Sequence, residues 1–191
     1  MDALGIETVT LALRDVIEQA LGAGTVYVGP LDDANVGDAR VVLFLYRVCA
    51  NASLRNEEHV VAGSTIADPP IVHRHAMPLD LYYLVTAGTR ETGGEAASLR
   101  TLGRVIQVLN AQPTLVGMTV QGEIVRVTFE HVSSDEMGRI WNLFPAINYR
   151  TSVVYVASPV WIDPMLPSTQ GPPVVEQQLH MGHLIDRGAA V

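Results

Sequence analysis

Six histidines are the residues of this 191-residue sequence whose spacing could support chemistry. His73 and His75 are separated by one residue and His180 and His183 by two, and imidazole is the commonest metal ligand in proteins. Neither pair has nearby cysteines or the spaced acidic partner that defines a zinc site. We therefore expect no metal site. The alternative, a small metal-dependent enzyme that uses the histidine-bearing loop, predicts stoichiometric metal.

No other catalytic motif is present in the sequence. It contains no G-x-S-x-G nucleophile elbow, no phosphate-binding P-loop and no dinucleotide-binding fingerprint. The single cysteine, Cys49, follows an apolar run, where a small hydrophobic side chain packs well and a reactive thiolate is not favoured. We therefore expect a structural or binding protein that has neither a catalytic set nor a cofactor.

The composition predicts one folded domain that associates with other subunits. Hydrophobic residues make up 48% of the chain and charged residues only 17%, which argues against a disordered chain and leaves apolar surface for contacts between subunits. The formal net charge is -8, and the twelve basic residues are all arginine. This negative charge argues against nucleic acid and anionic membranes as partners.

The N-terminal segment does not resemble a secretory signal. Residues 1–21 carry acidic side chains among their apolar ones and lack the basic start and uninterrupted apolar run of such a signal. No other segment approaches the length of a membrane span. We expect the protein to be made and folded in the cytoplasm.

Three segments have the periodicity of amphipathic helices. Residues 6–21 and 95–110 each carry an apolar stripe with spacings of three and four residues. A third helix begins with the capping pattern S-x-x-E at Ser133 and ends before Pro145, which lacks the amide that a helix needs. Gly103 interrupts the second helix, and we expect it to permit close packing against a sheet.

The strand patterns predict an α+β fold, with about four to five strands in one mixed sheet that the helices flank. Residues 41–48 are apolar on both alternating faces, which indicates a central strand covered on each side. Residues 49–77 show little periodicity, and because a loop of that length is usually functional, it is the first candidate contact surface. The predicted strands are residues 25–28, 41–48, 78–87, 123–132 and 149–163.

The last part of the chain differs in composition from the rest. Residues 164–191 hold four of the eleven prolines and no clear amphipathic helix. We therefore predict a domain over residues 1–163, followed by an extended, Pro-rich arm over residues 164–191. Apolar residues in such an arm can lie along a neighbouring subunit or add a strand to an exposed sheet edge, and the candidates are Val174, Val175 and Leu179.

Four blocks of the sequence, taken together, resemble a known family. They are "LFLYRVCANASLRN", "MPLDLYYLVTA", "LGRVIQVLNAQP" and "DEMGRIWNLFPAINYRTSVVYVASPVWID". In this order they are similar to the N-terminal domain of the cap, or tail terminator, of phage-tail-like extracellular contractile injection systems. The similarity runs from about residue 6 to residue 163, and the arm lies outside it.

The resemblance implies a phage tail-terminator fold and no enzyme activity. It implies a homo-hexameric ring on the end of the inner tube distal to the baseplate, which stops tube polymerisation and links the tube to the contractile sheath. The segment NASLRN matches the family's polar turn after the central strand, which implies interface residues Asn51, Leu54, Arg55 and Asn56. Arg150 and Trp161 are further candidates, and intramolecular packing is the alternative at these positions.

Two other interpretations stay open. A tail-completion protein of a true phage would have the same fold and ring but would bind a head connector, and neighbouring capsid and packaging genes would distinguish it. A cytosolic adaptor that is only dimeric would differ in mass. The sequence also leaves open the payload and target, whether the particle stays in the cytoplasm or is released, and whether the ring forms without the tube.

Overall fold

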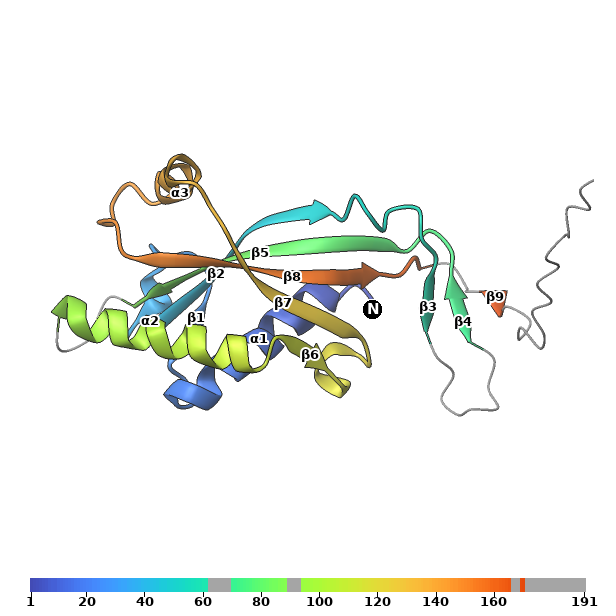
Figure 1. Cartoon of the computed structure of the whole chain (residues 1–191), viewed down its shortest axis with the longest axis horizontal. Helices are drawn as coiled ribbons and strands as arrows, with labels where there is room; N and C mark the ends of the chain where they lie inside the picture. The colour runs from blue at the N-terminus through green and yellow to red at the C-terminus, as the bar shows by residue number, and fades with distance from the viewer. Residues whose placement is uncertain (62–69, 89–93, 166–168, 171–191) are drawn as a thin grey trace, which may run out of the picture.

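A six-stranded sheet forms the body of the protein in the computed structural model, which describes residues 1–61, 70–88, 94–165 and 169–170 (Figure 1). The strand order is β1-β2-β5-β8-β7-β6. β1 pairs with β2 in parallel, and the other neighbours are antiparallel. The strands are β1 (Val26–Val28), β2 (Val41–Ala50), β5 (Met77–Ala87), β6 (Thr114–Val116), β7 (Ile124–Glu130) and β8 (Ser152–Ile162).

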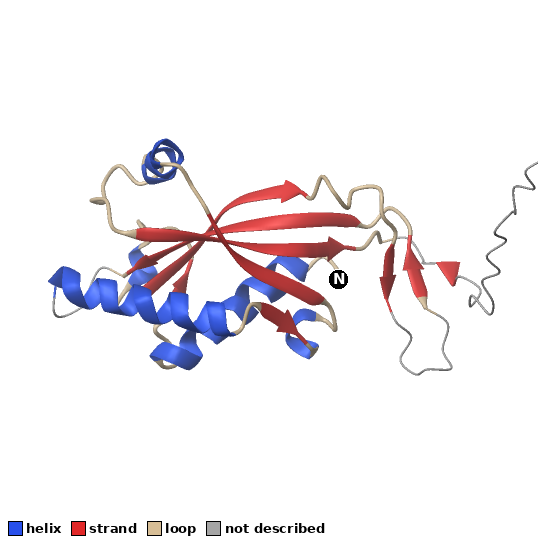
Figure 2. Ribbon diagram, in the orientation of Figure 1, coloured by secondary structure: helices blue, strands red, loops and turns tan. Residues whose placement is uncertain are grey.

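Two long helices cover one face of this sheet (Figure 2). They are α1 (Gly5–Leu21) and α2 (Gly94–Ala111), whose ends lie within one residue of the predicted ones. Alternate residues of β5 pack beneath them, because successive residues of a strand point to opposite faces, and these are Leu79, Leu81, Tyr83 and Val85. The main core is thus formed by the apolar stripes of both helices and one set of strand positions.

A third helix, α3 (Ser134–Trp141), covers one end of the opposite face. The hydroxyl of Ser133 accepts a hydrogen bond from the Glu136 amide at 3.2 Å, which confirms the predicted N-cap. The helix ends at Trp141 and continues as a turn toward Pro145. A second core cluster lies beneath it and includes Val42, Leu84, Ile140, Trp141, Phe144 and Val154.

The predicted α+β fold is confirmed, but the sheet has more strands than expected. β6 is too short to produce a recognisable period in the sequence. The segment predicted as a loop contains β3 (His59–Val61) and β4 (Ile71–His73), which form a separate small sheet with β9 (Thr169–Gln170). The beginning of the predicted arm therefore pairs with β4 of its own chain. Two short 3-10 turns, Ala34–Val36 and Met118–Val120, complete the described elements.

The second half of β2 departs from the prediction of a strand covered on both faces. Val41–Leu43 are buried, whereas Val48 is 44% exposed and Cys49 is half-buried. The reason is that β1 flanks only these first three residues of β2, and that Cys49, which pairs with Asp80, lies on the face that α3 covers only at one end. Cys49 is therefore not the core residue that its sequence context indicates, and the most deeply buried strand is β5.

Gly103 lies on the solvent side of α2, where an added Cβ atom would meet nothing within 4 Å. The prediction that this glycine permits close packing against the sheet is therefore wrong. Gly88 is the opposite case, because its Cβ would overlap with the carbonyl oxygen of Ala39. Gly103 is therefore dispensable for the described fold, whereas Gly88 is required.

Replacing Gly103 with alanine should raise the free energy of unfolding by about 0.5–1 kcal/mol, because alanine loses less backbone entropy in a helix. The melting temperature should rise by about 1–4 °C for a chain of this size. The matched control, Gly88→Ala, should be destabilising by about 1–3 kcal/mol through overpacking. Thermal and urea denaturation measure both effects, and a destabilised Gly103→Ala protein would contradict the open position of this residue.

Candidate assembly surface

Beyond α3, no described helix covers the face of the sheet opposite α1 and α2 (Figure 1). This face carries a cation next to an aromatic ring, Arg47 and Tyr82. The guanidinium carbon of Arg47 lies 4.9 Å from the centroid of the Tyr82 ring, and its Nε donates a hydrogen bond to the Cys49 sulfur at 2.9 Å. Its Nη1 lies 3.9 Å from a carboxylate oxygen of Glu136. Because Arg47 and Glu136 are both half-exposed, their ion pair contributes little, and Arg47 can turn to a partner.

The tyrosine hydroxyls next to Arg47 remain protonated. Burial raises the pKa of Tyr82, and the nearby Asp80 carboxylate raises it further. Burial also raises the pKa of Tyr46 to about 12, with a smaller contribution from Glu136. The rings therefore stay neutral at physiological pH. Because the Tyr46 hydroxyl is buried and has no hydrogen-bond partner among the described residues, this face presents a cation next to neutral rings.

Asn51 shapes the turn that follows β2. Its side-chain amide nitrogen donates to Asp80 Oδ1 at 2.9 Å and to Ser158 Oγ at 3.2 Å. Its side-chain oxygen accepts hydrogen bonds from the amides of Ser53 and Leu54, both at 3.0 Å. Since these bonds are all intramolecular, Asn51 can act on a partner through the conformation of the turn.

The rest of this turn is more accessible. Leu54 is half-buried, whereas Arg55 and Asn56 are exposed. The side chains of Arg55 and Asn56 make no hydrogen bond or ion pair with the part of the chain that the structure describes. They are thus the two sequence-predicted residues best placed to meet another molecule. Three further candidates lie outside the described residues: Val174, Val175 and Leu179.

His59 attaches the small sheet to the body of the protein. Its Nε2 lies 2.9 Å from a Glu123 carboxylate oxygen, and its Nδ1 lies 2.7 Å from Asp163 Oδ1. The ring also stacks on Trp161, with 4.9 Å between centroids and an interplanar angle of 8°. His59 is buried, so the sequence-predicted candidate Trp161 has a partner within its own chain.

Asp163 joins three parts of the chain at the same place. Its Oδ2 accepts a hydrogen bond from the amino group of Met1 at 2.8 Å and lies 3.8 Å from Nε2 of His73. Burial raises the pKa of Asp163, but the hydrogen bonds from Met1 and His59 outweigh it, and the pKa lies below its ordinary value. The ionised carboxylate therefore links β8, the small sheet and the first residue.

The histidines do not gather into a metal centre in the described part of the chain. Within it, no group of three or more His, Cys, Asp or Glu side chains is arranged to hold a metal ion. His75 is exposed in a turn, and His180 and His183 lie outside the described residues. None of the described helices is both long and apolar enough to cross a membrane.

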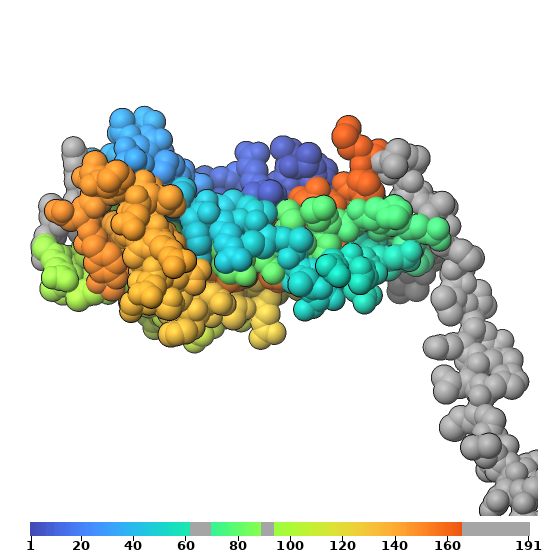
Figure 3. Space-filling view, turned by 90° about the horizontal axis from the view of Figure 1, so that it is seen from above, coloured from blue at the N-terminus to red at the C-terminus, as the bar shows by residue number. Residues whose placement is uncertain are grey.

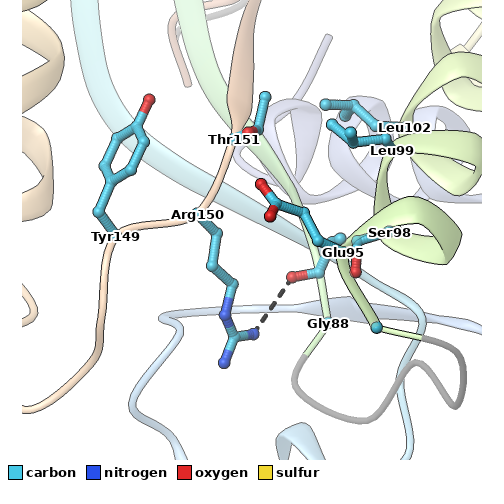
Figure 4. A pocket seen from close by; sticks show the side chains of 10 residues that line it. Gly88, Glu95, Ser98, Leu99, Leu102, Tyr149, Arg150 and Thr151 are labelled. Atoms are coloured by element: carbon cyan, nitrogen blue, oxygen red, sulfur yellow. Dashed lines mark hydrogen bonds between the residues drawn. The ribbon is translucent and has the colours of Figure 1, made fainter.

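Arg150 borders a cavity of about 410 Å³ at the end of the sheet where α2 begins (Figure 4). Its Nη1 donates to the carbonyl oxygen of Ala87 at 3.3 Å, and burial lowers the pKa of its guanidinium. Figure 4 shows Glu95 of α2 and Tyr149 on other sides of the same space. A guanidinium carries five N–H donors, so Arg150 retains donors for a partner's carboxylate or carbonyl group.

The outer edge strand β6 carries an apolar patch that the sequence prediction missed. Val116 pairs with Ile124 across the strands, and Met118 follows in the next turn. These side chains are 58%, 68% and 92% exposed, respectively. Apolar side chains gathered at a sheet edge are typical of a contact surface. The only signal for it in the sequence is the apolar composition of a segment too short to show a strand period.

The family inferred from the four sequence blocks is confirmed by comparison with known families. The sequence matches the family described as the Pvc16 N-terminal domain over residues 8–176. A comparison with curated protein sequences found no match.

Solved structures that share this fold include two terminators. One is the sheath/tube terminator of an extracellular contractile injection system, PVC, in its extended state, with a TM-score of 0.59 and 15% sequence identity over 94% of this chain and 65% of that chain. Another is the tube-terminating cap of the anti-feeding prophage, with a TM-score of 0.60 and 15% identity over 90% of this chain and 60% of that chain. The chain thus spans less than two thirds of the length of either structure.

The Asp163→Asn variant tests the carboxylate that joins the small sheet to the body. Because the pKa of Asp163 is lower in the folded protein, its contribution to stability is present above the unfolded-state value of about 3.9 and is lost as the pH falls through the folded value. At pH 7 the variant should lose about 1–3 kcal/mol of unfolding free energy. The difference from the wild type should shrink below about pH 4.

Denaturation at a series of pH values measures this difference. The control is Asp15→Asn, whose carboxylate is exposed and bonds to the neighbouring Arg14, and its effect should stay within about 0.5 kcal/mol. An Asp163→Asn protein that differs from the wild type equally at pH 7 and at pH 3 would show that the ionised carboxylate is not the stabilising group.

Proposed function

Because the chain belongs to the Pvc16 N-terminal domain family, we propose that it is a structural cap, or tail terminator, of a contractile injection system and not an enzyme. The observation that carries this proposal is the shared fold, which extends over at least 90% of the chain in both terminator structures. The described surface agrees with a binding role, because its exposed features are sheet edges, an apolar patch and unpaired arginine donors.

In the proposed assembly, six copies form a ring on the end of the inner tube and connect the tube to the sheath. Such a ring ends polymerisation if one of its faces is complementary to the tube end and its other face lacks the docking features of a tube subunit. Six contacts that engage together also gain affinity through the fixed geometry of the ring. Assembly takes place in the cytoplasm, and the particle either stays there or is released.

The turn after β2 supplies the most direct contacts in this proposal. Asn51 and Leu54 hold its conformation, and Arg55 and Asn56 meet the neighbouring subunit or the tube. Arg150 offers its remaining donors at the other end of the sheet. Trp161 acts indirectly, through the position of His59.

Mass photometry, followed by negative-stain imaging with and without the cognate tube protein, tests the proposed function. The expected result is a ring with six times the 20.6 kDa chain mass, or tubes that are shorter and capped at one end. A monomer or dimer that never associates with tube protein would overturn it. Association with a capsid connector in place of the tube would instead identify a tail-completion protein.

The Arg55→Glu variant should weaken ring or tube binding without unfolding the protein, because the side chain is exposed. Removal of an interface arginine costs about 1–2 kcal/mol per contact, and six contacts multiply this loss across the ring. We expect fewer capped tubes by imaging and an unchanged melting temperature.

Arg104→Glu is the matched control, since it makes the same charge change at an exposed arginine on α2. Equal loss of capping in both variants would point to net charge as the cause, and unchanged capping in Arg55→Glu would remove this residue from the interface.

A further inference from the structure

The second half of β2 has an open edge. β2 runs for ten residues, but β1 pairs with only Val41, Val42 and Leu43. The last bond along this side is donated by the Gly29 amide to the Leu43 carbonyl at 3.1 Å. From Leu45 to Ala50, the edge that faces away from β5 has no strand partner among the described residues. In Figure 1 nothing is drawn beside this part of β2, and in Figure 3 the cyan atoms of its end and the following turn lie at the surface.

A groove lies where β1 stops and this open edge begins. Its volume is about 410 Å³, and its lining is mostly apolar. α1 forms one wall through Glu7, Thr10 and Leu11, and β2 contributes Phe44 and Leu45. A strand that continued the line of β1 along β2 would therefore find unpaired backbone groups and a groove for alternate side chains. These are the two features by which an extended segment is recognised at a sheet edge.

The shape of the edge selects the kind of strand that can bind. The pairing of β2 with β5 shifts register between Leu45 and Arg47, which is a β-bulge. A bulge bends and twists its strand, and so it hinders pairing with the flat edge of another sheet. A segment that is not part of a sheet can follow such an edge. The edge therefore favours a single extended segment over the edge strand of a folded neighbour.

The C-terminal arm of the chain offers a candidate for such a segment. The described part of the arm, β9, is already a strand added antiparallel to β4. Residue 174 comes four residues after Gln170, so at about 3.3 Å per residue the segment begins within about 13 Å of the end of β9. It can therefore reach a neighbouring subunit whose β2 edge packs close to this end of the molecule. Residues 174–179 lack proline, so as a strand each could offer its backbone N–H.

The side-chain pattern of this segment matches the edge. In a strand, Val175 and Leu179 share one face and Glu176 points to the other. Leu45 pairs with Tyr83 on the helix-covered side, where the groove lies, and Arg47 pairs with Tyr82 on the open side. Apolar side chains that enter the groove would therefore place Glu176 on the side of Arg47, whose present ion pair is weak.

We propose that the open edge of β2 and the groove beside α1 bind residues 174–179 of a second copy as an added strand. This inference deepens the proposed ring and rests on it for the neighbouring copy. Each copy then both donates an arm and accepts one, so the contact is heterologous and can close into a ring.

Disulfide cross-linking of the full-length protein tests this contact, in a Cys49→Ser background that leaves no native thiol. One protein carries Leu45→Cys in the groove and another, with an affinity tag, carries Val175→Cys. Mixed under mild oxidation, they should give a covalent dimer of one tagged and one untagged chain. Local binding raises the effective thiol concentration from about 10 μM to about 1 mM, so the initial rate of dimer formation should exceed that of the control by on the order of 100-fold.

The control is Leu99→Cys with the same Val175→Cys protein, because Leu99 is an exposed leucine of α2 away from the groove. Leu11→Cys, on the helical wall of the groove, repeats the test in case Leu45→Cys does not fold. No dimer with either groove position, or equal yields with Leu99→Cys, would overturn the proposal. A cross-link within one chain, in a dilute Leu11→Cys/Val175→Cys double variant, would instead assign the groove to the protein's own arm.

The tube-capping assay separates this inference from the proposed function. If tubes are capped although no cross-link forms, the proposed strand exchange is wrong and the proposed cap function stands. If a specific cross-link forms in a protein that never binds tube, the proposed cap function is wrong and the proposed strand exchange stands.

Discussion

Burial of β5 on both faces is the constraint on which the rest of the structure depends. Leu81, Tyr83 and Val85 lie under α1 and α2, while Leu84 lies under α3. The Tyr83 hydroxyl is 2.8 Å from that of Thr10, and burial raises the pKa of Tyr83, so it stays neutral. Because a buried hydroxyl without a partner costs about 1–3 kcal/mol, this contact also fixes α1 against the sheet. A strand held on both faces cannot shift register without exposing apolar side chains.

Polar contacts then position the parts that leave this core. Asn51 is bonded to Asp80, His59 to Asp163 and Arg150 to Ala87. Apolar packing constrains the direction of a loop only weakly. A hydrogen bond constrains it more strongly, especially where one partner is charged. The same contacts explain why several predicted interface residues have partners within the chain. Their role in assembly, as proposed, is to hold the exposed neighbours Arg55 and Asn56 in place.

The long elements could be predicted from the sequence because their periods repeat several times. The two faces of β5 and the cap at Ser133 follow from local patterns. β3, β4 and β6 have three residues each, too few to establish a period. His59 could not be identified, because its partner Asp163 is 104 residues away along the chain. The partial exposure of Cys49 could not be predicted either, since its side chain lies on the sheet face that α3 covers only at one end.

A terminator must bind the tube end with one surface, and its opposite surface must not offer the site to which a further subunit could bind. The two faces of this sheet differ chemically, since α1 and α2 close one, and the other is closed only beneath α3. The two edges differ as well. β6 and the turn after it carry exposed apolar side chains, whereas the second half of β2 lies beside a groove and has, among the described residues, no strand partner on its outer side. Identical rings can stack indefinitely only when opposite faces are complementary. A protomer whose faces and edges are all unlike supplies the asymmetry that the proposed cap requires.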